Sequence, residues 1–154
     1  MDTTNFLILF ASLTVGALVG IIIFYVLLAV AEWKIFTKAG EAGWKGLIPF
    51  YSTYVQYRLT WKTKMFWILL AVEIVSGILQ NFSDNLLATF LAAVLSIVGL
   101  VIIIMGQHKL SKSFGHGAGF TVGLVFLSPI FLLILGFGSS QYQGNLSWPN
   151  QARP

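Results

Sequence analysis

The sequence predicts an all-α membrane protein with four transmembrane helices and one amphipathic helix on the cytoplasmic surface of the membrane. Its 154 residues are 57% hydrophobic and only 9% charged, whereas soluble domains carry about 25% charged residues. The apolar residues gather in four segments, and aromatic residues recur at helical spacing between the first two. Lipid is the solvent that fits such a chain, because a domain of this size cannot bury so much apolar surface.

The four predicted spans are of unequal strength. They lie at about residues 6–31, 65–79, 86–106 and 120–137. The first and third are long enough to cross a bilayer, which takes about 20 residues. The second is short and contains Glu73, and the fourth is interrupted by Pro129, which we expect to kink it. Because the connections are short, we expect one helical domain over residues 1–142 and a polar tail at 143–154.

The basic residues predict the orientation of the chain. Eight of the nine Lys and Arg residues fall in the connections after the first and third spans, and Arg153 lies in the tail. Connections rich in Lys and Arg stay in the cytoplasm. We therefore expect the N-terminus and the C-terminus to lie outside the cytoplasm. The net charge of +4 has the same origin, so we do not expect nucleic-acid binding.

The first cytoplasmic connection, from Glu32 to Lys64, contains the predicted surface helix. We expect Pro49 in its first turn, where a missing N–H costs nothing. The aromatic residues that we expect at the interface are Trp44, Phe50, Tyr54, Tyr57 and Trp61, and Ser, Thr and Gln side chains occupy the other face of the helix. The pattern is typical of an amphipathic helix in the membrane surface. Its aromatic side either anchors the helix in lipid or docks a partner or ligand, and both interpretations stay open.

The second cytoplasmic connection is a basic loop rich in glycine that includes His108, Lys109 and Lys112. Glycines and basic side chains near the start of a helix can hold a phosphate. The sequence lacks a Walker motif, so a lipid headgroup is the anion that we expect here. The alternative is a flexible loop that only sets the topology.

Four segments resemble the signature of a family of small, uncharacterised bacterial multipass membrane proteins. They are Lys34–Gly40, Gly43–Tyr54, Lys109–Gly115 and Leu135–Gly138. Members of that family carry Lys-Ala-Gly, then Pro-Gly-Trp, then Ile-Pro-Ile/Phe-Tyr-Asn. Here Ala42 stands where Pro is common and Ser52 where Asn is common, and both changes are compatible with the same fold. The resemblance implies a bacterial inner-membrane protein and no activity. A similar stretch accompanies some bacterial signal peptidases, which implies a role near protein export.

Glu73 is the one charged residue in a predicted span. A charge at the centre of a bilayer costs about 2.5–3.5 kcal/mol on insertion scales, so the residue is a functional candidate. At helical spacing it shares a small, polar face with Ser76, Gly77 and Gln80. We expect a neutral Glu73 that hydrogen-bonds a neighbouring helix, with proton or cation coupling as the alternative. The polar candidates in the third and fourth spans are Ser96 and Ser128.

Small residues repeat at a spacing of four along the first span, at Ser12, Gly16 and Gly20. Such stripes let two helices approach closely. The contact is either within the bundle or between two copies of the chain, and the sequence does not choose between them.

The groups that catalysis requires do not come together in the sequence. Cysteine is absent, His108 and His116 belong to no zinc motif, and no acid stands in position to orient them. We therefore expect no enzyme activity, no metal and no cofactor. The favoured function is a non-catalytic accessory, assembly or regulatory partner of another protein in the bacterial inner membrane. The alternative is a small oligomeric transporter or channel subunit that uses Glu73.

Overall fold

The computed structural model describes residues 3–82 and 84–145, and the regular elements of this part of the chain are all helices. They are α1 (Thr3–Lys38), the 3-10 helix η1 (Gly43–Leu47), α2 (Tyr51–Thr60), α3 (Thr63–Gln80), α4 (Leu86–Ser113), α5 (Ala118–Phe126) and α6 (Ser128–Phe137). The tail from residue 146 onward, with Arg153, lies outside the described residues.

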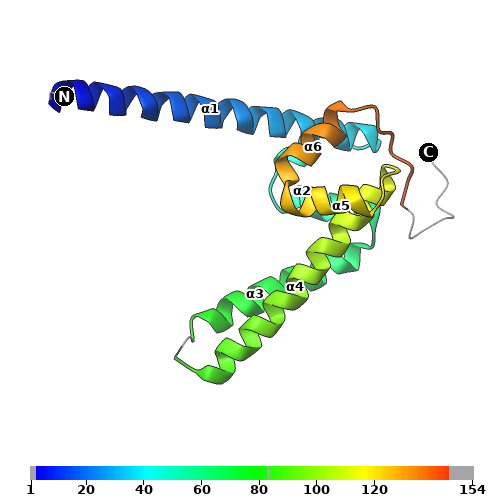
Figure 1. Ribbon diagram of the computed structural model, residues 1–154. Coiled ribbons are helices and arrows are strands. Elements are labelled where there is room, and N and C mark those ends of the chain that lie inside the picture. The colour runs from blue at the N-terminus through cyan, green and yellow to red at the C-terminus, as the bar shows by residue number, and fades with distance from the viewer. Residues whose placement is uncertain (1–2, 83, 146–154) are drawn as a thin grey trace.

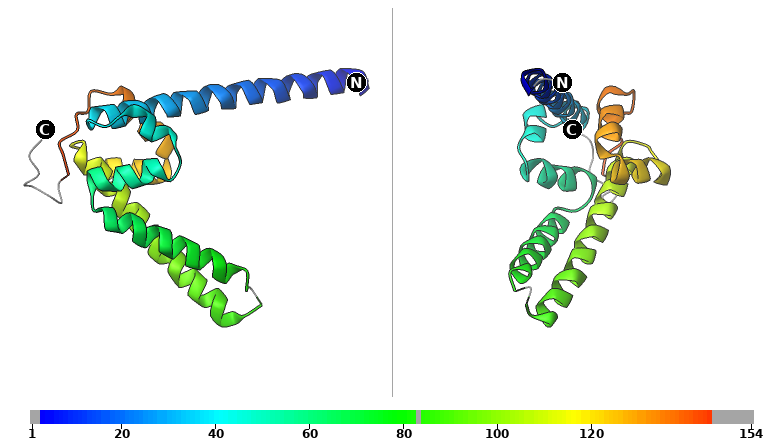
Figure 2. Two further views of the ribbon diagram at one scale, coloured as in Figure 1. Left: turned by 180° about the vertical axis from the view of Figure 1, so that it is seen from behind. Right: turned by 60° about the vertical axis from the view of Figure 1, so that its left-hand side comes forward.

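Two long arms diverge from a small helical core (Figure 1). One arm is α1, and the other is the hairpin of α3 and α4, whose free end lies far from the core (Figure 2). The core consists of η1, α2, α5 and α6 together with the C-terminal ends of α1 and α4. All the described Lys and Arg residues lie in or next to this core, which we call the basic end of the molecule.

The arms contain three helices that are long and apolar enough to cross a membrane, namely α1, α3 and α4. They correspond to the first three predicted spans. At 1.5 Å per residue, the 36 residues of α1 extend over about 54 Å, more than the roughly 30 Å of a hydrocarbon core. The last turns of α1 therefore have length to project beyond the bilayer and to join the core.

The fourth predicted span is not one kinked helix but two short ones. α5 has nine residues and α6 has ten, and each is too short to cross a bilayer alone. The break falls at Leu127, with φ −127° and ψ 41°, because Pro129 lacks an N–H to continue the helix and suits the first turn of the next one. A side chain on Gly123 would overlap the Phe131 ring, so its absence lets α6 fold against α5.

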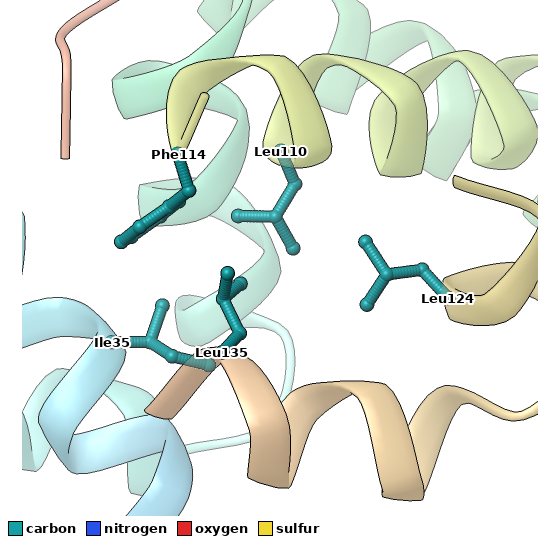
Figure 3. Close-up of a cluster of buried hydrophobic side chains, with 5 residues drawn as sticks. All are labelled: Ile35, Leu110, Phe114, Leu124 and Leu135. Carbon is teal, nitrogen blue, oxygen red and sulfur yellow. The ribbon is translucent and has the colours of Figure 1, made fainter. Parts of the chain in front are cut away.

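One cluster of buried side chains joins α1 to the second half of the chain. Figure 3 shows Ile35, Leu110, Phe114, Leu124 and Leu135, which come from α1, α4, α5 and α6 and point toward one another. Burial of side chains of this kind stabilises the junction by about 1.5–3 kcal/mol each.

The junction between α1 and α6 is also close and hydrogen-bonded. A Cβ on Gly136 would lie 2.7 Å from the Cα of Ala31, so the two backbones touch. The Lys38 ammonium donates to the carbonyls of Leu135 at 2.7 Å and Gly138 at 2.8 Å. Lys38 thereby satisfies carbonyls at the C-terminal end of α6 that lack partners within that helix.

The described part of the tail returns to the basic end. The Tyr142 hydroxyl donates to the Leu59 carbonyl at 2.5 Å, and the Asn145 amide donates to the carbonyls of Arg58 and Trp61 at 3.1 and 2.7 Å. These residues therefore lie at the same end of the molecule as the basic connections. The predicted fourth span corresponds to α5 and α6, which both pack in the core.

Candidate functional site

The candidate site is the basic end, where two long helices stop in the same way. Gly40 after α1 and Gly115 after α4 both have φ 78°, the left-handed conformation that glycine adopts without strain. In each case the glycine N–H donates to the carbonyl three residues back, and the next N–H donates to the carbonyl five residues back. This is a Schellman motif, and it places Glu41 and His116 directly after the two helix ends.

Glu41 ties the connection after α1 to α2. Its carboxylate accepts hydrogen bonds from Lys45 at 2.5 Å and from Arg58, and both are ion pairs. Partial burial acts to raise the pKa of Glu41, but the two cations outweigh that effect and leave the pKa below its ordinary value. Burial raises the pKa of the nearby Tyr142, and the charge of Glu41 raises it further. The tail and the connection thus share one electrostatic environment.

The aromatic residues predicted for the surface helix do not share one face. Tyr57 and Trp61 are buried with Phe66 of α3 and Ile102 of α4, and the Tyr57 hydroxyl donates to the Ile102 carbonyl at 3.3 Å. Tyr54 is half-buried and packs edge-on against the Phe66 ring. These three aromatics therefore anchor α2 to the hairpin of the same chain.

The other two predicted aromatics, Trp44 and Phe50, remain on the outside, at 48% and 73% exposure. Pro49 is not in the first turn of α2, because the helix begins at Tyr51. Phe50 has φ 63° and ψ −45°, and the Tyr51 N–H donates back to the Pro49 carbonyl at 2.7 Å, which makes a γ-turn. A backbone conformation of this kind costs of order 1–3 kcal/mol.

The predicted basic loop is mostly helix. His108, Lys109 and Lys112 lie in the last turns of α4, which continues to Ser113 rather than ending near residue 106. The His108 Nδ1 lies 3.0 Å from the Thr121 hydroxyl of α5, so its ring joins two helices. Lys109 is half-buried and Lys112 is exposed.

His116 belongs to the short connection between α4 and α5 and fixes the tail there. Its ring stacks on Phe120 with centroids 4.1 Å apart, and its Nε2 lies 2.8 Å from the Ser140 hydroxyl. The Gln143 N–H donates to the Ser113 carbonyl beside it at 2.7 Å. The connection thus serves as a joint between α4, α5 and the tail.

The polar residues predicted within the spans separate into two groups. Ser76 is buried, donates to the Ala92 carbonyl at 3.2 Å and lies 2.9 Å from the Ser96 hydroxyl. This pair, not Glu73, hydrogen-bonds α3 to α4. Ser128 is half-buried and begins α6, away from the hairpin.

Glu73 is exposed, and its carboxylate lies over Gly99 of α4, where a Cβ would be 2.6 Å from Oε1. Among the described residues no hydrogen bond joins Glu73 to α4, in contrast to our expectation. The residue lines a cavity of about 330 Å³ between α2, α3 and α4, together with Tyr57 and Gln107. The Gln107 Oε1 is buried and lacks a hydrogen-bond partner within the described part of the chain.

Sequence reasoning missed Glu32, which follows the predicted first span by one residue. It lines a small cavity of about 40 Å³ among α1, α2, α4 and α6, and also an adjoining cavity of about 430 Å³ between α1 and the start of α2. Tyr25, Leu28 and Ala29 share its helix face and line the second cavity too. The helical spacing of these four residues was the one feature of the sequence that could have indicated the site, because it places an acid at the end of an apolar helix face.

Within residues 3–82 and 84–145, no group of three or more His, Asp or Glu side chains comes together to hold a metal ion. The acids and bases that do meet form hydrogen bonds and ion pairs between helices. Three cavities in the described part of the chain contain a carboxylate, two of them lined by Glu32 and one by Glu73.

One family model matches the chain, over residues 44–145, and its description is a family of unknown function, DUF5684. The matched region begins in η1 and ends at Asn145, whose amide bonds to carbonyls at the end of α2. Helix α1 and the predicted signature at residues 34–40 precede the matched region. No curated protein and no solved structure matches the chain. Because the family model covers more than half of the 154 residues, the chain belongs to the family of unknown function DUF5684.

Proposed function

We propose that this chain is a non-catalytic membrane protein of the bacterial inner membrane that acts as an accessory, assembly or regulatory partner. One observation carries the proposal. In the most apolar stretch of 18 consecutive residues in α1, no described residue is buried within the chain, although the end of the same helix is packed in the core. A spanning helix held at one end and bare along its length presents its whole surface to another membrane protein.

The small residues of α1 support this role. Nothing lies within 4 Å of a Cβ built on Gly16 or Gly20, and Ser12 bonds only to the Leu9 carbonyl of its own helix. A stripe of small residues allows close packing of a second transmembrane helix. The bundle interior, one of the two contacts that the sequence left open, does not use this stripe in the described structure.

We further propose that the chain crosses the membrane three times, with the N-terminus outside and the tail in the cytoplasm. The positive-inside rule supports a cytoplasmic basic end, and the contacts of Tyr142 and Asn145 with α2 support the same side for the described part of the tail. A fluorescent protein fused after Pro154 should fold and fluoresce in the cytoplasm. Alkaline phosphatase activity from the same fusion site would instead favour four spans.

Purification of the full chain in mild detergent tests the accessory role. A second polypeptide in stoichiometric amount, lost when Gly16 and Gly20 are both changed to Leu, is the expected result. The matched control is Gly77→Leu on α3, which also has nothing within 4 Å and should leave the complex intact. A chain that purifies with no other polypeptide and with no second copy contradicts the proposal.

A transporter or channel subunit is the second candidate, favoured by the cavity that contains Glu73 and the unpartnered Gln107 oxygen. In that case the chain purifies as a homo-oligomer. Glu73→Gln then abolishes proton or cation flux in proteoliposomes while the protein remains folded. A variant with unchanged flux removes this candidate.

A further inference from the structure

The larger of the two cavities that Glu32 lines is a distinct site at the end of the α1 arm. α1, the connection after it and the start of α2 enclose about 430 Å³. The polar and aromatic side chains that line this space are Tyr25, Glu32, Phe50, Ser52 and Thr53. The space is large enough for a small organic group, since ligand cavities begin at about 300 Å³.

Glu32 supplies this cavity with a carboxylate that the described residues leave without a hydrogen-bond or ion-pair partner. The cations nearest in sequence are engaged elsewhere. Lys34 lies over the Phe137 ring at 4.3 Å, Lys38 bonds to two carbonyls of α6 and its tail, and Lys45 pairs with Glu41. A carboxylate in such a place is stabilised by a positive charge, and no described side chain supplies one, so a cation from outside the described chain would find its counter-ion here.

The side chains around Glu32 select the kind of cation. Tyr25 and Phe50 offer aromatic rings, and such rings attract ammonium groups. Ser52 and Thr53 add hydroxyl oxygens that accept hydrogen bonds from N–H donors. The γ-turn at Phe50 sets the direction in which its side chain leaves the backbone at the rim. An ammonium group fits this set better than a bare metal ion, because only one carboxylate is present.

We infer that this cavity binds an ammonium group, with Glu32 as its counter-ion and Tyr25 and Phe50 as its aromatic walls. The cavity extends from Tyr25, within the predicted first span, to Glu32, just after its end, so it lies next to the boundary of the apolar segment. Both the headgroup of an aminophospholipid and a soluble amine can reach it. The inference does not depend on the accessory role, since it concerns a ligand and not a protein partner.

Native mass spectrometry of the full chain in detergent tests the site, with phosphatidylethanolamine and phosphatidylglycerol as probes. The wild-type chain should retain phosphatidylethanolamine in preference to phosphatidylglycerol. Glu32→Gln should weaken that retention about tenfold, because a charge-assisted hydrogen bond is lost. The matched control is Asp84→Asn, which removes one acid from the connection between α3 and α4 and should not change retention.

Soluble ethanolamine, measured by isothermal titration, distinguishes the source of the ammonium group. Binding of ethanolamine that Glu32→Gln removes supports the site with a soluble ligand, and selective lipid retention supports it with a lipid. Tyr25→Leu on the exposed arm should weaken either ligand about twofold to fivefold without unfolding the chain. If neither probe distinguishes wild type from Glu32→Gln and Tyr25→Leu, the inference is wrong.

Discussion

The two arms extend from the same core but differ in whether their small and polar residues contact a second helix. In the hairpin, Ser76 bonds to Ala92 and Ser96 on the facing helix, so polar groups of α3 and α4 meet each other. In the α1 arm, Gly16 and Gly20 meet nothing. A paired arm can be stable in lipid by itself, whereas a single-helix arm keeps its packing surface for another molecule. This difference is the reason that we propose α1 as the partner surface.

The largest expected loss of stability comes from disrupting the contact between α1 and α6, which joins the α1 arm to the core. Gly136→Ala places a methyl group 2.7 Å from the Ala31 Cα, and overpacking of this kind costs about 1–3 kcal/mol. Gly77→Ala, in open space on α3, should be neutral or stabilise the helix by up to about 1 kcal/mol. Thermal unfolding in detergent measures both. Equal melting temperatures for the two variants would show that α1 is not held by this contact.

A smaller effect distinguishes hydrogen bonds between helices from those within one helix. Ser76→Ala removes the bonds that join α3 to α4 and should destabilise the hairpin by about 0.6–1.7 kcal/mol. Ser12→Ala removes only a bond to the Leu9 carbonyl in its own helix, so its melting temperature should not change. A loss of stability in Ser12→Ala would mean that α1 has a partner within the folded chain.

The smallest effect concerns the pH dependence of the basic end. Because the pKa of folded Glu41 lies below its ordinary value of 4.5, its ion pairs stabilise the fold above about pH 4.5. That contribution is lost as the pH falls through the lowered pKa. Arg58 is partly exposed, so the effect should stay within about 1 kcal/mol. Melting temperatures from pH 7 to pH 3 should fall less in Glu41→Gln than in wild type; identical slopes would contradict the assignment.

The sequence predicts the helices of the arms well, because a bilayer requires long apolar runs and these are visible in composition alone. It also predicts a helix between the first two spans. It does not predict that Tyr57 and Trp61 face the hairpin, because the same aromatic pattern can be buried against lipid or against protein. Pro129 predicts a kink in one helix, whereas the structure has two helices with a break at Leu127. Nothing local distinguishes a bent span from two helices, because Gly123 makes room for a ring eight residues away in Phe131.

The candidate site was harder to predict than the fold. Glu73 stood out because a charge in a span is rare, yet Ser76 makes the contact between the helices. Glu32 did not stand out, because an acid at the end of a span is ordinary in sequence. Its cavity exists only because the connection after α1 folds back past Gly46 and Phe50. The local pattern of residues does not predict contacts between segments that are distant in sequence.

Single-cysteine cross-linking tests most directly the claim that the α1 arm meets a protein partner. The native chain contains no cysteine, so a benzophenone maleimide can be attached at one chosen position. Cysteine at Gly16 or Gly20 in α1 should yield a discrete cross-linked polypeptide in native membranes, and cysteine at Gly77 in the hairpin should not. Cross-links from Gly77 alone, or lipid adducts alone at Gly16 and Gly20, would contradict the account.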